Sequence, residues 1–275
     1  MTLTRRMTLT AVRGVEVFHW NPKRPVVRGR LGRLVPLRRP VGNFGDLLGP
    51  EVVDRLAPDS FAPPGSPRLL TVGSILHFAA DSDVVWGSGV NGKVPTTDFR
   101  ANRLDVRAVR GPLTAEFLQA RGIEVPEIFG DPGLLAPALL GVRRSETPRI
   151  AVTHLPNLHD APAWRRLPGF LSPTTDPRRV FEAIGQSRLV ISSSLHGLVI
   201  ADALGVPVSL VRPTKESLFK YQDYLEGTGR RLGHVSDDVS EALRHRLEPL
   251  QWDSEPLVTA FPRDIWVPQP ERARG

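Results

Sequence analysis

The sequence predicts an α/β protein with two parallel sheets, one in each half of the chain, and a cleft between them. Short apolar runs alternate with amphipathic stretches, an order typical of strand–helix units. The alternation pauses at the polar stretch 141–148 and then starts again, and the 275 residues suffice for two units of ordinary size. Because parallel sheets bind ligands at the carboxyl ends of their strands, we expect the site in the cleft between the halves.

The first half is expected to alternate strands and helices from residue 14 onward. Most strand candidates are short apolar runs that end in or near glycine, as buried parallel strands do. Helices are expected at 46–56, with Pro50 in the first turn, and at 112–122, which starts with proline and ends with glycine. The expected strands are GVEVFHW (14–20), RLLTVGS (68–74), SDVVWGSG (82–89) and RLDVRAVRG (103–111), and 128–140 is expected to be a strand, a turn and a helix.

The second half repeats this pattern from residue 149. Its apolar runs are bounded by polar or proline-containing stretches, and its helices show apolar residues at helical spacing. The expected strands are RIAVTHL (149–155), RLVISSS (188–194) and VPVSLVR (206–212), and the expected helices cover 176–187, 195–205, 214–227 and 236–247.

The net charge of +7 is concentrated at the N-terminus. Residues 1–40 hold ten Lys or Arg and a single acid, Glu16, which leaves the rest of the chain near neutral. Such a segment is either a solvated arginine-rich stretch or an arm that binds anionic lipid, nucleic acid or a polyanionic substrate. It has no aromatic residues interleaved with its arginines and the chain has no nucleic-acid reader motif, so we expect no nucleic-acid partner.

Composition limits the compartment and the chemistry. The absence of cysteine excludes disulfides, thiolate nucleophiles and cysteine metal sites. No apolar run approaches the ~18 residues of a membrane span, and the N-terminus lacks the apolar stretch of a secretory signal. We expect a cytoplasmic protein that the arm could hold at the inner face of the membrane. The expected segments are the basic arm with the first strand (1–40), a first unit (41–145), a second unit (146–265) and a tail (266–275).

The stretch SSSLHG has the composition of an anion site. Ser192, Ser193 and Ser194 end a buried strand, and the next helix opens with His196 and Gly197 close behind them. A helix N-terminus offers free N–H groups and a partial positive charge, and the hydroxyls add donors. His196 is the one side chain there that can exchange a proton near neutral pH. Serines at a helix start are often only caps, but their combination with histidine and glycine at a strand end favours a ligand site.

A second candidate is GNFGD. Gly42 and Gly45 permit a tight turn and close backbone approach. Asp46 could simply cap the following helix. Asn43, a loop amide between glycines, is well placed to hold a ligand hydroxyl. Taken alone, this stretch is explained equally well by a turn and by the wall of a site.

Together these stretches resemble the polysaccharide pyruvyl transferase family. The resemblance covers about 14–265, and SSSLHG is its most specific element. It implies two Rossmann-like domains in a GT-B-like fold, with the acceptor on the first and the donor on the second. Such proteins move the pyruvyl group of phosphoenolpyruvate onto sugar hydroxyls of a bacterial polysaccharide or its lipid-linked precursor, usually as a ketal. The motifs occur in the family's order: VGNFGDLLGP, LLTVGSIL, VVWGSGV, VRAVRGPLTAEFL, FGDPGLL, VISSSLHGLVIADALGVP, FKYQDYL and LVTAFP.

The resemblance also suggests roles for side chains. Asn43, Gly45 and Asp46 would face the acceptor, and His196 would be the general acid that protonates the enol carbon. No metal and no cofactor are expected beyond phosphoenolpyruvate as donor substrate.

Phosphoenolpyruvate carries a carboxylate and a phosphate, which suit planar bidentate donors. Arg110 matches the family's Arg-Gly-Pro element, whereas Arg107 could equally be a solvated charge at a strand end. Lys220 would offset phosphate charge, with Lys215 as a second candidate. A solvated lysine on an amphipathic helix is an equal alternative for Lys220.

Two other function classes compete with this interpretation. A sugar-nucleotide glycosyltransferase of the same architecture would need an acid to hold the ribose, and Glu216 is the candidate. A non-enzymatic protein could bind a partner through the basic arm alone. Asp131 is expected to cap a helix, whereas His154 could be either a ligand contact or a satisfied strand-end residue.

Overall fold

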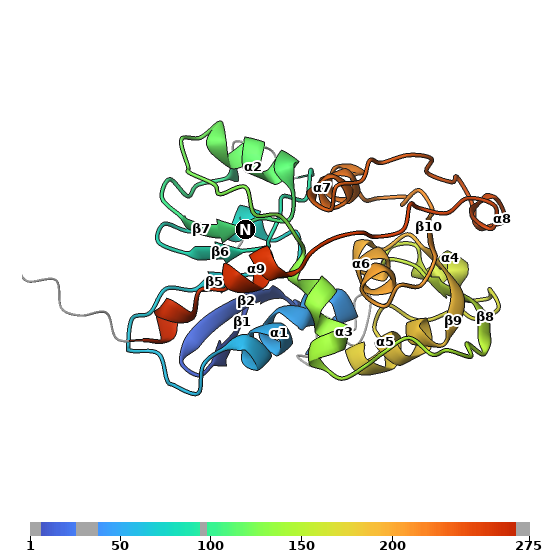
Figure 1. Cartoon of the computed structure of the whole chain (residues 1–275), viewed down its shortest axis with the longest axis horizontal. Helices are drawn as coiled ribbons and strands as arrows, with labels where there is room; N and C mark the ends of the chain where they lie inside the picture. Colours follow the sequence, from blue (N-terminus) through green and yellow to red (C-terminus); the bar gives the residue numbers. More distant parts are fainter. Residues whose placement is uncertain (1–6, 26–37, 94–97, 268–275) are drawn as a thin grey trace, which may run out of the picture.

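The computed structural model describes residues 7–25, 38–93 and 98–267, and its strands form two main sheets (Figure 1). The first sheet has the strand order β1-β2-β5-β6-β7 and the second β10-β9-β8. Neighbouring strands are parallel in both sheets except β1 and β2, which are antiparallel. The predicted α/β class with parallel sheets is confirmed, and the arrangement is compatible with a GT-B-like fold. The strands are β1 (Met7–Val12), β2 (Val15–Trp20), β5 (Leu69–Leu70), β6 (Val84–Trp86), β7 (Asp105–Ala108), β8 (Ile150–Leu155), β9 (Ser187–Ser192) and β10 (Val208–Leu210).

The described part of the expected arm is not separate from the first sheet. β1 was not expected, and it forms a hairpin with β2 through Arg13 and Gly14, whose φ angles of 43° and 91° suit a tight turn between antiparallel strands. Val15 and Val17 on β2 are buried against the core. A small two-stranded sheet of β3 (Lys23–Pro25) and β4 (Arg38–Pro40) follows. Residues 1–6 and 26–37 of the arm lie outside the described residues.

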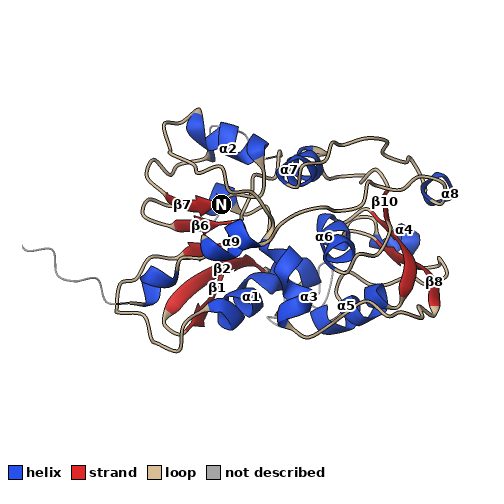
Figure 2. Ribbon diagram, in the orientation of Figure 1, coloured by secondary structure: helices blue, strands red, loops and turns tan. Residues whose placement is uncertain are grey.

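Helices cover and connect the two sheets (Figure 2). α3 packs against both α1 and α6 between the sheets. None of the helices in the described ranges is long and apolar enough to cross a membrane. The helices are α1 (Leu48–Leu56), α2 (Pro112–Gln119), α3 (Ala136–Leu139), α4 (Ala161–Trp164), α5 (Pro177–Gly185), α6 (Leu195–Ala203), α7 (Phe219–Gly227), α8 (Val239–Ala242) and α9 (Glu255–Thr259), with 3₁₀ turns η3 (Phe44–Leu47), η4 (Leu76–Phe78), η6 (Pro132–Leu135) and η7 (Arg263–Trp266).

Two expected helices are shorter than their sequence pattern. α7 begins at Phe219 rather than at residue 214, because the Ser217 hydroxyl accepts a hydrogen bond from the Phe219 N–H and holds the preceding residues in a turn. α8 ends at Ala242 rather than at residue 247. The chain beyond it is drawn to the second sheet, where the Leu247 N–H donates to the Val208 carbonyl over 2.9 Å.

The two halves share one hydrophobic core. A single cluster includes Val17 of the first sheet, Val190 of the second and Leu198 of α6 between them. The chain also returns at its end to the first sheet, where Trp86 Nε1 donates to the Leu257 carbonyl over 2.8 Å and Trp266 Nε1 donates to the Val12 carbonyl over 3.2 Å. Leu257, which was assigned to the second unit, and Trp266, which was assigned to the tail, thus both contact the first sheet. The division into domains at 145/146 stays a prediction.

Candidate active site

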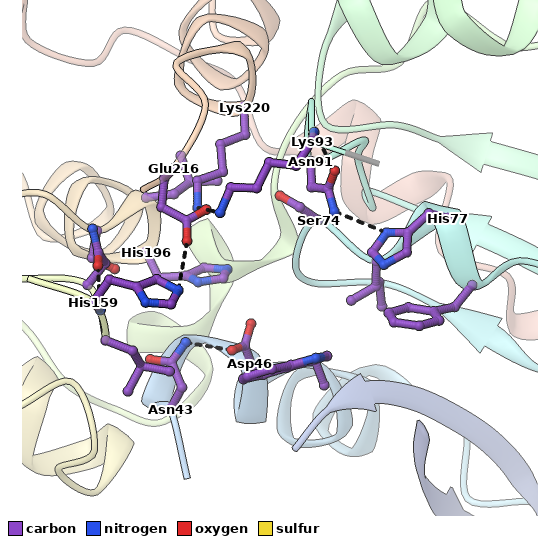
Figure 3. A pocket seen from close by; sticks show the side chains of 17 residues that line it. Asn43, Asp46, Ser74, His77, Asn91, Lys93, His159, His196, Glu216 and Lys220 are labelled. Atoms are coloured by element: carbon purple, nitrogen blue, oxygen red, sulfur yellow. Dashed lines mark hydrogen bonds and ion pairs between the residues drawn. The ribbon is translucent and has the colours of Figure 1, made fainter. Parts of the chain in front are cut away.

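A cavity of about 410 Å³ lies at the ends of strands from both sheets. From the first sheet it includes Trp20, the last residue of β2. From the second it includes Asn157, just beyond β8, and Ser194, just beyond β9. The position agrees with the rule that α/β sheets bind ligands at the carboxyl ends of strands. The lining is Trp20, Asn43, Asp46, Ser74, Ile75, His77, Phe78, Asn91, Lys93, Asn157, Leu158, His159, Ser194, Leu195, His196, Glu216 and Lys220 (Figure 3).

His196 lies in this cavity at the start of α6 and is 7% exposed. Its Nε2 is buried and has no hydrogen-bond partner. Burial, with a smaller effect from the charges of Lys220 and Arg110, lowers the pKa of His196 to about 3. The imidazole is therefore neutral at pH 7 and has one buried ring nitrogen unpaired, which fits a group that exchanges a proton with a ligand.

The His196 imidazole packs directly against Gly45. A Cβ added at Gly45 would lie 2.1 Å from His196 Nδ1, and the Phe44 ring meets the imidazole edge-on at a centroid distance of 6.4 Å. The expected role of Gly45 as a residue of close approach therefore holds, but the group that approaches is His196 rather than a ligand.

Replacing Gly45 with alanine is expected to displace the His196 ring and to reduce turnover. Overpacking of this kind costs roughly 1–3 kcal/mol of unfolding free energy, which urea denaturation measures. Gly233→Ala is the matched control, because a Cβ at Gly233 meets no atom within 4 Å. Equal turnover and stability in the two variants would contradict the assigned packing.

Asn43 and Asp46 form a pair on the neighbouring wall (Figure 3). Asn43 Nδ2 donates to Asp46 Oδ2 over 2.5 Å, and Asn43 Oδ1 is buried without a partner. Burial raises the pKa of Asp46 to about 6, although the Asn43 hydrogen bond and the charge of Lys220 oppose the shift. The pair offers an unsatisfied amide acceptor beside a carboxyl that titrates near neutral pH, a combination suited to holding and deprotonating a hydroxyl.

Two lysines share one carboxylate above this pair. Lys93 Nζ lies 2.6 Å and Lys220 Nζ 3.1 Å from Glu216 Oε2, and His159 Nε2 lies 3.8 Å from Glu216 Oε1 (Figure 3). Burial lowers the pKa of Lys220, whereas Glu216 and Asp46 act in the opposite direction. Lys220, the predicted donor contact, lines the cavity. Lys93 and His159 were not assigned to the site from the sequence.

The serine-rich strand end contributes mainly structure. Ser192 Oγ donates to the Leu155 carbonyl and accepts from the Ser194 N–H, and Ser193 Oγ accepts from the Asn157 N–H. Ser194 lines the cavity. A Cβ at Gly197 would lie 2.2 Å from Ser192 Oγ. Of the four, only Ser194 is positioned to contact a ligand directly, while the others fix the strand-to-helix turn.

Arg110 is not in the cavity lining. It is fully buried, Nε and Nη2 lie 2.9 and 2.8 Å from Asp223 Oδ2, and Nη2 also donates to the Val90 carbonyl over 2.6 Å. Its Nη1 donates to Ser74 Oγ over 2.6 Å, and Ser74 lines the cavity. This geometry does not fit the direct donor contact that we predicted for Arg110, because its guanidinium is already engaged inside the protein. Arg110 instead links Asp223, Val90 and Ser74.

The other predicted arginine and lysine do not reach the cavity either. Arg107 is on β7, where it pairs with Asp105 over 2.6 Å and Asp264 over 2.7 Å. Lys215 is exposed and outside the cavity lining. Asp131 accepts from the Gly133 N–H over 2.9 Å and so caps η6 as expected. His154 Nδ1 donates to the Pro168 carbonyl over 2.7 Å, so His154 is a satisfied strand-end residue.

The comparison with known protein families decides the family. The model described as polysaccharide pyruvyl transferase matches residues 66–213, more than half of the chain. The chain belongs to the polysaccharide pyruvyl transferase family. The matched region of this pyruvyl transferase family member contains Ser74, Lys93 and His196, whereas Asp46 and Lys220 lie outside it.

Two curated relatives match parts of the chain. "Succinoglycan biosynthesis protein ExoV" of Rhizobium meliloti (strain 1021) is 33% identical over 206 residues, which is 68% of this chain and 62% of that protein. "Uncharacterized protein L143" of Acanthamoeba polyphaga mimivirus is 27% identical over 181 residues, 60% of this chain and 61% of that protein. The chain thus spans less than two thirds of each relative's length. No solved structure matches the chain.

A second, mostly aromatic wall of the cavity was not predicted from the sequence. It consists of Trp20, Ile75, His77 and Phe78, with the Asn91 amide nitrogen 3.4 Å from His77 Nδ1. Burial lowers the pKa of His77 to about 4, so this ring is neutral at pH 7. The one signal for this wall was Trp20, which ends a predicted strand. The others lie on 3₁₀ and loop segments that have no helical or strand periodicity. The family member therefore has a cavity with a cationic wall and an aromatic wall.

Proposed function

We propose that this protein transfers the pyruvyl group of phosphoenolpyruvate to sugar hydroxyls, as a ketal, on a bacterial polysaccharide or its lipid-linked precursor. The observation that carries the proposal is the neutral, unpaired His196 beside Lys93 and Lys220 in a cavity of a pyruvyl transferase family member. The name of the relative from Rhizobium meliloti links that protein to succinoglycan, which supports an exopolysaccharide as the acceptor class.

The cationic wall suits a compact dianion. Lys93 and Lys220 converge on Glu216 Oε2, and the start of α6 adds backbone N–H groups beside them. Phosphoenolpyruvate would place its phosphate between the lysines and its carboxylate toward Ser194. Glu216, already paired with both lysines, does not fit the ribose contact that a sugar-nucleotide enzyme needs.

The chemistry requires a proton on carbon and two attacks at one centre. His196 donates a proton to the methylene carbon of the donor, which becomes a methyl group while positive charge develops at the adjacent carbon. A first acceptor hydroxyl attacks that carbon and loses its proton. The carbon–oxygen bond to phosphate then breaks, and a second hydroxyl completes the ketal. One hydroxyl proton restores His196, and Asp46 takes up the other and passes it to the departing phosphate.

The acceptor is best accommodated at the aromatic wall. Trp20 and Phe78 present aromatic faces that can cover the apolar face of a sugar ring, while polar groups around them take its hydroxyls. Asn43 and Asp46 line the same cavity, with the carboxyl able to receive a hydroxyl proton.

If Asp46 is the base, activity falls as pH drops through the pKa of its carboxyl. Burial raises that pKa from 3.8 to about 6. With saturating phosphoenolpyruvate, which protonates His196, the acidic limb of kcat/KM for the acceptor should therefore have its midpoint near 6 rather than near 4. Asp46→Asn should remove the limb and lower kcat/KM by on the order of 10²–10⁴. Asp131→Asn is the matched control, because burial raises the pKa of Asp131 likewise to about 6 while that residue lies outside the cavity lining. A limb that survives in Asp46→Asn would rule Asp46 out as the base.

The direct test of the function is incubation with phosphoenolpyruvate and a panel of p-nitrophenyl and lipid-linked sugars. We expect phosphate release that depends on one acceptor, together with acceptor mass increased by one pyruvyl ketal. Absence of phosphate release with every acceptor, combined with transfer from a sugar nucleotide, would replace the proposal by a glycosyltransferase.

We also propose that residues 1–40 bring the protein to anionic membranes, where lipid-linked glycan precursors are made. This segment carries ten Lys or Arg and one acid, and each basic residue near such a surface contributes roughly 1 kcal/mol. Cosedimentation with vesicles containing anionic phospholipid should be strong at low salt and lost at high salt. Absent or salt-insensitive binding would contradict the electrostatic origin.

A further inference from the structure

Three side chains with metal-ligating atoms meet on the surface of the second sheet, outside the cavity lining. His234, Glu241 and His245 each offer one such atom, and these atoms all lie within 4.8 Å of one another. His234 Nε2 is 2.7 Å from Glu241 Oε1, and the two imidazole rings are 4.2 Å apart between centroids at an interplanar angle of 37°. Tetrahedral zinc with ligands at about 2.0–2.1 Å separates ligand atoms by roughly 3.3–3.5 Å, so small side-chain rotations would close the set around one ion.

The fold holds these three residues in place. Backbone hydrogen bonds fix their chain segments, and the second carboxylate oxygen of Glu241 is also hydrogen-bonded. Glu241 lies on α8, where the Asp238 side chain accepts from its N–H over 2.8 Å. Its Oε2 accepts from the Asp237 N–H over 2.7 Å, which fixes the carboxylate and leaves Oε1 toward His234. His245 lies three residues beyond the end of α8, and its carbonyl accepts a hydrogen bond from the Ser209 hydroxyl on β10.

The segments before and after α8 are also tied to β10. The Ser236 N–H donates to the Leu210 carbonyl over 3.1 Å, two residues beyond His234. On the other side, the Leu247 N–H donates to the Val208 carbonyl over 2.9 Å, two residues beyond His245. Both histidines therefore sit on chain segments that are anchored to the same strand. An ion bound by both would link these segments.

We propose that His234, Glu241 and His245 form a zinc site with solvent at the fourth position. Among the abundant divalent ions, Zn²⁺ is the one that best accepts two imidazoles and a carboxylate as ligands. Mg²⁺ and Ca²⁺ prefer sites made of oxygen ligands only. The site stabilises the outer edge of the second sheet and takes no part in the pyruvyl transfer. No spacing in the sequence predicted this site, because loop and turn segments separate its three residues.

Isothermal titration of ZnCl₂ into the full-length, chelator-treated protein without an affinity tag tests the proposal. We expect saturable binding of one ion per chain, together with a rise in Tm. Each of His234→Gln, Glu241→Gln and His245→Gln should weaken the affinity at least tenfold and remove the rise in Tm. Glutamine keeps the hydrogen-bonding capacity at position 241, so these exposed or partly exposed variants should remain folded.

Two controls separate this site from other zinc ligands. His159→Gln removes a histidine of the active cavity, and Glu124→Gln removes an exposed acid elsewhere. Both should leave zinc affinity unchanged. MgCl₂ should give no saturable binding at this site. Absence of zinc binding, or binding that any one of the three ligand variants leaves intact, would overturn the three-residue site.

Discussion

Replacing His196 with glutamine is expected to lower pyruvyl transfer by on the order of 10²–10⁴-fold while phosphoenolpyruvate still binds. Glutamine keeps hydrogen-bonding capacity near the buried Nε2 position but delivers no proton. The pKa of His196 in the free protein is about 3, so the ring is neutral when the donor arrives. A bound phosphate dianion favours the charged imidazole and raises that pKa. Donor binding should therefore protonate His196, which can then transfer this proton to the enol carbon.

Calorimetry in buffers of different ionisation enthalpy measures this proton uptake directly. The wild-type protein should take up a proton on binding phosphoenolpyruvate, and His196→Gln should not. His154→Gln is the matched control, since His154 lies at a strand end outside the cavity lining. Normal turnover in His196→Gln would defeat the assignment, and failure to bind the donor would make His196 a binding residue only.

Replacing Arg110 with methionine is expected to lower the free energy of unfolding by about 3–5 kcal/mol, because it leaves Asp223 buried without its partner. Both side chains are fully buried, and Asp223 also accepts from the Thr114 N–H over 2.9 Å and from its hydroxyl over 2.7 Å. The network ties α2 to α7. Urea denaturation measures the loss.

Two further variants separate the buried pair from ordinary surface charge. Arg107→Lys alters an exposed arginine–aspartate pair and should cost less than about 1 kcal/mol. Arg110→Met combined with Asp223→Leu should recover part of the loss, because no buried charge then stays unpaired. A loss in Arg110→Met no larger than that in Arg107→Lys would contradict the assigned role and would reopen direct donor binding by Arg110.

Periodicity and strand-end position predicted the features of the site that depend on local sequence. His196, Ser194 and Asp46 lie in the cavity because each follows directly from a strand-to-helix junction or a turn before a helix. Lys220 was placed there by family resemblance rather than by pattern. Lys93 and His77 could not be found in this way, since loops beyond β5 and β6 carry them and only the folded chain brings them to Glu216 and Trp20.

The position of a charged residue in the sequence does not show which group it pairs with. Arg110 lies in a motif beside a helix start, which suggested a ligand contact, but its partner Asp223 is 113 residues away. A buried arginine must be paired, and the pairing of Arg110 with Asp223 engages N–H groups that we had expected to bind the ligand. The prediction of the fold was limited in the same way, because only its local features could be predicted. The α/β class followed from the alternation of strand-like and helix-like segments. The antiparallel strand β1 and the return of 255–266 to the first sheet depend on long-range packing.

The most direct measurement of the central claim is the NMR spectrum of acceptor sugar incubated in D₂O with phosphoenolpyruvate labelled at its methylene carbon. Ketal transfer with protonation at carbon predicts a labelled methyl group on the sugar that carries one solvent-derived deuterium, formed in equal amount to inorganic phosphate. A labelled methylene retained on the sugar, or no donor-derived carbon on any sugar, would contradict the account.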